Sequence, residues 1–99
     1  MEQLSQTQRQ YLRKIAHDLR PLVQLGKQGL TPNLLATIDH ALQAHELIKL
    51  KFLDYQDQKQ ELAEQIVQEL QAHLVAVVGN VAILYRYQPD PDRRTIELP

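Results

Sequence analysis

The spacing of apolar residues changes repeatedly along this chain of 99 residues, and that alternation limits the fold more than any other feature. Three segments carry apolar residues at three- and four-residue intervals, which is the pattern of an amphipathic helix. Between and after them lie short runs rich in large and branched apolar residues, which indicate strands. The sequence therefore predicts the element order α-β-α-β-α-β-β.

Residues with capping or turn preferences bound these elements. Ser5 and Gln8 have the spacing of a capping box, and Thr31 followed by Pro32 suits the start of a helix. Gly79-Asn80 suits a two-residue hairpin turn. The helices are expected at about Ser5–Asp18, at Pro32–His45, and from a cap at Asp57 to about Leu70. The strands are expected at Pro21–Leu25, Leu47–Leu53, Leu74–Val78 and Val81–Tyr87.

We interpret this order as an α/β fold, a two-layer sandwich with the helices on one face of a mixed four-stranded sheet. The length suits a single domain over residues 1–99. Its tail, from about Gln88, is expected to be irregular, and weak strand pairing at Thr95–Leu98 is left open. The helix residues expected to face the core are Leu4, Tyr11, Leu12, Ile15, Leu19, Leu34, Leu35, Ile38, Ala41, Leu42, His45, Leu62, Ala63, Ile66, Val67 and Leu70.

Composition argues against several classes of protein. No apolar run reaches the roughly 18 residues of a membrane span, and residues 1–6 lack the apolar segment of a signal peptide. The chain contains no cysteine, so disulfides and thiolate metal sites are excluded. We therefore expect a cytoplasmic protein with no membrane partner.

The net charge of −1 does not by itself indicate a nucleic-acid partner, but the charges are unevenly distributed. Residues 1–53 hold seven Lys and Arg residues against four acids, a net charge of +3. Residues 54–99 hold four against eight, a net charge of −4. A chain divided in this way can present one basic face despite its acidic total. Random scatter of charge over a solvated surface is the alternative interpretation.

The loop between the first strand and the second helix is the strongest candidate binding site. It reads Gly26-Lys27-Gln28-Gly29, with a glycine at each end that permits positive φ and close approach of a ligand. The free amides and dipole of the following helix should open onto the loop, as they do in phosphate sites. We therefore predict that Gly26, Lys27, Gln28 and Gly29 bind a nucleic-acid backbone. A plain strand-to-helix turn is the alternative.

Further basic residues are candidates for nucleic-acid contacts. Arg9 and Arg13 lie along one edge of the first helix's apolar stripe, although exposed arginines on a helix are often only solvated. Lys49 and Lys51 share the strand face opposite the core residues, where lysines can also discourage edge pairing. Arg86 follows the last strand's apolar run and has the same ambiguity.

No catalytic or metal constellation emerges from the sequence. His40 and His45 are five residues apart, not the four that place two imidazoles on one helix face. His45 falls on the buried stripe, and His17 and His73 have no carboxylate or cysteine in ligand spacing. We therefore predict no catalytic residues, metal, cofactor or small-molecule substrate.

Aromatic residues are too few for a stacking platform. Tyr55, Tyr85 and Tyr87 could each stack on an unpaired base, but the chain has one Phe and no Trp. Tyr85 is expected to pack in the sheet. We therefore expect a nucleic acid to be recognised by its shape and not by base stacking.

Three blocks of the sequence resemble the CRM domain family, which covers the bacterial YhbY-like proteins and plant organellar splicing factors. The blocks are Tyr11–Leu19 with Pro21–Thr31, then His45–Lys51, then Val77–Gly79 with Leu84–Arg86. The resemblance covers nearly the whole chain, and the family's GxxG loop carries over onto Gly26 to Gly29 without a gap. Lys49 and Arg86 fall within these blocks, which ranks them above Lys51 as candidates.

The resemblance implies an RNA-binding fold similar to the C-terminal domain of translation initiation factor three. It also implies association with precursors of the large ribosomal subunit. We therefore expect a non-enzymatic protein that binds ribosomal RNA in these precursors during ribosome assembly. The first alternative is a protein–protein adaptor that uses the sheet face or the acidic third helix. A small enzyme acting on a phosphate ligand is a further alternative, disfavoured by the missing acid and base residues.

Overall fold

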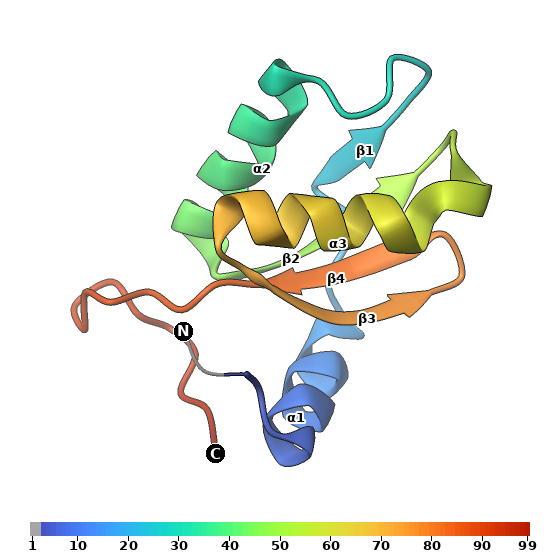
Figure 1. The fold of residues 1–99 in the computed structure, drawn as a ribbon. Helices are drawn as coiled ribbons and strands as arrows, with labels where there is room; N and C mark the ends of the chain where they lie inside the picture. The colour runs from blue at the N-terminus through green and yellow to red at the C-terminus, as the bar shows by residue number, and fades with distance from the viewer. Residues whose placement is uncertain (1–2) are drawn as a thin grey trace.

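The computed structural model describes residues 3–99, and its four-stranded sheet has the order β1-β2-β4-β3 (Figure 1). β1 pairs with β2 in parallel, whereas β4 lies between β2 and β3 and is antiparallel to both. The predicted α/β class and mixed sheet are confirmed. The elements in chain order are α1 (Gln6–Ala16), β1 (Val23–Leu25), α2 (Pro32–His45), β2 (Leu47–Phe52), the 3-10 turn η1 (Gln56–Gln58), α3 (Lys59–Leu70), β3 (His73–Val78) and β4 (Val81–Tyr85).

The helices cover both faces of the sheet, which corrects the expectation that all three lie on one face. α2 and α3 cover one face and α1 lies on the other (Figure 1). In β2, Ile48 and Leu50 pack in the core beneath α2 and α3, whereas Leu47 packs against α1. β4 contributes buried residues to both cores, so its apolar run is nearly continuous. A continuous run of this kind is typical of a strand covered on both faces.

Capping residues set the start of α1. Their hydrogen bonds also explain why a polar residue, Gln8, lies in the apolar stripe of this helix. Ser5 Oγ accepts from Gln8 N at 3.1 Å, and Gln8 Oε1 accepts from Ser5 N at 3.0 Å. The predicted capping box is therefore confirmed. The helix ends at Ala16, two residues before the predicted end. Tyr11 and Leu19, expected in the core, are 38% and 40% exposed; Leu19 lies beyond the helix, where helical spacing no longer applies.

The start of α3 differs from the prediction. Asp57 lies inside η1, and α3 begins at Lys59 after Gln58, which makes no side-chain capping bond. The predicted cap at Asp57 is therefore wrong. Tyr55 precedes η1 in a left-handed conformation with φ +58°, and this reversal turns the chain from β2 into α3.

The tail after Tyr85 contains no helix or strand among the residues described, and Thr95–Leu98 pairs with no strand. The tail is held by side chains instead. Thr95 N and Oγ1 donate to Glu46 Oε2 at 2.8 and 2.5 Å. Ile96 and Leu98 pack against the core under α1. The tail therefore completes the α1 side of the molecule.

Candidate nucleic-acid interface

The loop Gly26–Gly29, called the GKQG loop from here on, closes as one turn in which Gly29 N donates to Gly26 O at 3.0 Å. Gly29 has φ +72°, in the left-handed region that favours glycine, so the loop uses this freedom at Gly29 but not at Gly26. Lys27 and Gln28 are exposed at the tip. Their amides donate to no other residue in the described range 3–99. The loop thus presents one ammonium group together with unused main-chain donors.

The first turn of α2 follows the loop closely. Thr31 Oγ1 accepts from Leu34 N at 3.1 Å, and Pro32 occupies the first helical position, as predicted. The helix contains no acidic residue in its first turn. Its amino-terminal dipole therefore adds positive potential on the side of the loop.

Tyr55 supports the loop, and sequence reasoning did not find this role. Its hydroxyl donates to Lys27 O at 2.9 Å. Its ring would lie 3.4 Å from a Cβ at Gly29, so the ring packs against that glycine. In addition, Leu53 N donates to Leu25 O at 2.9 Å and ties the segment before Tyr55 to the end of β1. The hydrogen bond from Tyr55 to Lys27 joins residues 28 positions apart, and no local pattern in the sequence indicates it.

Beside the loop, part of the α1-side face of the sheet is uncovered. The strand register places Gln24, Lys51, Val81 and Val78 in one row across β1, β2, β4 and β3. Gln24, Lys51 and Val78 are exposed. We call this row the open face. Because neighbouring strands lie about 4.8 Å apart, Lys51 is close to Gln24, two residues before Gly26. Lys51, ranked below Lys49 from sequence, is therefore the strand lysine nearer the loop.

A groove of about 290 Å³ lies between the open face and α1. Val78, Val81 and Ile83 give it an apolar lining, and we call it the valine groove. Two predicted RNA-binding residues, Arg13 and Lys49, also line it. The structure therefore brings Arg13 and Lys49 together next to the open face.

Lys49 also has a structural role. Its Nζ donates to Leu19 O at 3.0 Å and to His17 O at 3.3 Å. A cation at this position stabilises the carboxyl end of α1, where the helix dipole is negative. These bonds use two of the three N–H groups of the ammonium. Lys49 thus contributes charge to the groove while it fixes the end of α1.

Arg9 binds the edge of the sheet, away from the loop. Val75 is the additional residue in a register shift of β3, between Leu74 and Ala76. Arg9 Nη1 donates to Val75 O at 2.9 Å and also to Leu74 O. The guanidinium therefore satisfies carbonyl groups at this irregularity, where the ladder is disrupted.

Arg86 lies at the end of the sheet opposite the loop, which we call the far end. Its Nη1 donates to Asp39 Oδ1 at 2.6 Å and to Leu70 O at 3.1 Å, and its Nη2 donates to Asp39 O at 3.0 Å. The side chain is only 17% exposed. Arg86 therefore joins β4 to α2 and α3 and is not brought together with the loop.

Buried polar groups also gather at the far end. Burial, followed by the nearby Glu46 carboxylate, raises the pKa of Tyr85 to about 12. The Tyr85 hydroxyl and Glu46 Oε1 have no hydrogen-bond partner among the described residues. Burial also lowers the pKa of His73, whose ring stacks on Tyr85 with centroids 6.2 Å apart. These groups lie at the far end of the sheet, away from the GKQG loop.

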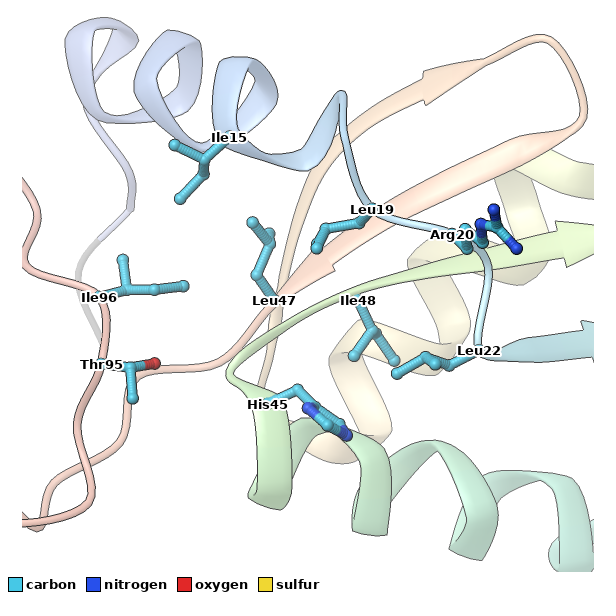
Figure 2. Close-up of a pocket in the computed structure, with 9 residues that line it drawn as sticks. All are labelled: Ile15, Leu19, Arg20, Leu22, His45, Leu47, Ile48, Thr95 and Ile96. Carbon is cyan, nitrogen blue, oxygen red and sulfur yellow. The ribbon is translucent and has the colours of Figure 1, made fainter.

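A second groove, of about 450 Å³, opens at the far end between α1, the end of α2 and the tail. Figure 2 shows apolar side chains along it, among them Ile15, Leu47 and Ile96. His45 lines this groove and is exposed, so the expectation that it lies in the core is wrong. α2 ends there, and the next residue, Glu46, is buried instead.

Within residues 3–99, no three His, Asp or Glu side chains are grouped so that they could hold a metal ion. No helix in this range combines the length and the apolar content needed to cross a membrane. The GKQG loop and the adjoining open face present the exposed side chains of Lys27 and Lys51 to a polyanionic ligand.

Comparisons with known proteins concern the family and the fold of the chain. Residues 4–86 match the model of the CRS1 / YhbY (CRM) domain. An "RNA-binding protein" of Haemophilus influenzae is 44% identical over 87% of this chain and 88% of its own length. The "Probable RNA-binding protein YqeI" of Bacillus subtilis is 37% identical over 97% and 99%. The solution structure of the hypothetical protein SAV1595 from Staphylococcus aureus superposes with a TM-score of 0.82, at 38% identity, covering 97% of this chain and 99% of that one.

Proposed function

Since this chain belongs to the CRS1 / YhbY (CRM) domain family, we propose that it binds RNA and holds the RNA backbone with its GKQG loop. The names of its relatives support RNA as the partner. The observation that carries the role of the loop is its exposed turn, in which Lys27 and unused main-chain amides lie next to the start of α2. Such groups bind phosphate oxygens well.

The proposed footprint runs from the loop over Lys51 to Arg13 and Lys49 at the valine groove. These groups would contact phosphate and sugar, which positions an RNA without reading its sequence. Arg9 and Arg86 are left out of the footprint because they lie away from the loop, at the edge of the sheet and at its far end, where their guanidinium groups donate to oxygens of the protein. The footprint thus holds about four cationic side chains.

A salt titration tests this proposal. With about three or four phosphates neutralised, affinity for an RNA hairpin should fall about 20- to 150-fold between 50 and 200 mM salt. Lys27→Ala should reduce the slope of log K against log salt by about one. The matched control is Arg93→Ala, which removes the same charge from the exposed tail and should leave the slope unchanged. Equal slopes for Lys27→Ala and the unmodified protein would contradict the role of the loop.

We further propose that the RNA is ribosomal RNA in precursors of the large subunit, bound in the cytoplasm during ribosome assembly and without a catalytic step. The three sequence blocks that resemble the CRM family support this choice. Co-sedimentation of the protein with large-subunit precursors on a sucrose gradient, lost after RNase treatment, is the expected result. Crosslinking should then map the RNA segment. If the protein remained only in the gradient fractions of free protein, the proposal would be contradicted.

A protein–protein adaptor is the second candidate function, and the far-end groove of Figure 2 is the observation that favours it. Leu22 at this groove is 57% exposed, and Arg20 also lines it. An apolar peptide that carries a carboxylate would suit such a groove. An adaptor should retain its protein partner after RNase treatment, whereas a protein that reaches its partners through RNA should lose them.

A further inference from the structure

We propose that the valine groove receives one unpaired nucleobase of the RNA held by the GKQG loop, an inference that rests on the function proposed above. The preferred ligand would then be an RNA with a bulged or otherwise unstacked nucleotide next to a paired segment. An uninterrupted duplex would offer the loop its backbone but would leave the groove empty.

The lining of the groove suits the flat, weakly polar face of a base. Val78, Val81 and Ile83 project from the same face of the sheet, because Val78 pairs with Val81 and Ile83 lies two residues further along β4. Val78 is 46% exposed, although it is a large apolar side chain. Pro21 adds a further apolar surface. Covering these groups with a base would remove apolar surface from water.

The rim of the groove has the charge that a nucleotide requires. Arg13, His17 and Lys49 line it, and the lining residues in the described part of the chain include no acid. Arginine and histidine side chains can stack on an unpaired base, and both can donate to phosphate or base oxygens. An apolar peptide would need no such ring of basic groups. Charge complementarity therefore favours a nucleotide over a protein side chain.

The position of the groove links it to the loop. Lys51 pairs with Gln24 on one side and with Val81 on the other, so a single row of the sheet joins the end of β1 to the groove. With strands about 4.8 Å apart, this row is about 10 Å across. A strand of RNA can therefore keep its backbone on Lys27 and Lys51 while one base turns into the groove.

The volume of the groove also fits a single base. At about 290 Å³ it lies at the lower limit of ligand pockets, which are about 300–1,000 Å³. One ring system with its substituents can therefore enter the groove. The far-end groove is larger, at about 450 Å³, but it lies away from the loop.

The test compares RNA hairpins that differ only in one bulged position. The probes are four hairpins with a bulged A, C, G or U, the same hairpin with an abasic bulge, and a fully paired hairpin. At least one bulged base should raise affinity about tenfold over the abasic probe, as expected for burial of one base. Because the backbone is retained, all probes should share the same salt slope.

Two variants locate the effect. Val78→Gln changes an exposed side chain and should abolish the difference between the bulged and abasic probes without changing the salt slope. Val81→Gln should also abolish this difference in affinity. It tests the groove at a second position, in case a glutamine at residue 78 can itself contact the base. The matched control is Leu22→Gln, which alters an exposed apolar residue of the far-end groove and should preserve the difference.

The outcomes separate this inference from the proposed function. Salt-dependent binding of every probe with equal affinity for bulged and abasic RNA would overturn the base-binding groove and leave the loop's role intact. A bulge preference that survives both valine variants, or that disappears in Leu22→Gln alone, would also overturn it. No salt-dependent binding of any probe would overturn the proposed function together with this inference.

Discussion

The two ends of the sheet carry basic side chains that are used in different ways. At the loop end, Lys27 and Lys51 are exposed, and their side-chain ammonium groups make no hydrogen bond or ion pair to any residue in the described range. At the far end, Arg86 donates to Asp39 and Leu70, and Arg94 donates to Gln88 O at 2.9 Å and lies over the Tyr87 ring. The comparison teaches that the bonds of a cationic group, and not its residue type, indicate whether it is available to a ligand.

The largest expected effect concerns the stability of the far end. Arg86→Ala should lower the free energy of unfolding by about 2–3 kcal/mol, because it removes several charged hydrogen bonds and leaves Asp39 without its partner. RNA affinity, measured where the variant is folded, should stay within twofold. Urea unfolding supplies the stability and a binding titration the affinity. A large loss of affinity in a folded variant would break the distinction between the two ends.

The next effect concerns the backbone of the loop. Gly29→Ala should cost about 1–2 kcal/mol of unfolding free energy, because φ is +72° and a side chain is strained there. The new Cβ would meet Tyr55 only at ordinary contact distance, so a clash adds little. The matched control is Gly26→Ala, which has open space and no positive φ, and which should change stability by less than about 0.5 kcal/mol. Equal costs at both positions, measured by urea unfolding, would show that the loop is not held in this conformation.

The smallest effect concerns a buried hydroxyl at the far end. Below pH 10, Tyr85→Phe should change stability by no more than about 1 kcal/mol, because the hydroxyl has no partner among the described residues. The pKa of Tyr85 is raised to about 12, above its usual value of 10.0, so the neutral phenol favours the folded state below pH 10. That contribution is lost as the pH rises from 10 to 12. Tyr85→Phe should therefore flatten the alkaline part of the stability curve, and an identical curve for both proteins would count against this assignment.

Local features of the fold were predictable from sequence because their causes are local. The capping box at Ser5 and Gln8 and the cap at Thr31 each act over three residues, and both are present. α2 has the predicted bounds, Pro32–His45, since a capping threonine and a proline mark its start. The chain reversal at Tyr55 has no comparable signal, and the start of α3 was therefore misplaced.

Features that depend on distant contacts were not predictable. The apolar stripe of α1 indicates that the helix packs on something, but not which face of the sheet it covers. Similarly, Arg9 and Arg86 look like exposed basic residues in sequence, whereas their partners are Val75, 66 residues away, and Asp39, 47 residues away. Of the candidate site, the GKQG loop could be read from its glycines and the following helix start. The support from Tyr55 and the proximity of Lys51 required the tertiary structure.

The central claim, that RNA contacts the loop end and not the far end, is tested most directly by NMR. A ¹H–¹⁵N spectrum of the protein, titrated with one of the bulged hairpins, reports which amides sense the RNA. We expect the strongest shifts at residues 26–29, at Lys51 and along the carboxyl-terminal half of α1, with little change at Arg86 or Thr95. Shifts concentrated at residues 86–96, with an unchanged GKQG loop, would contradict the account.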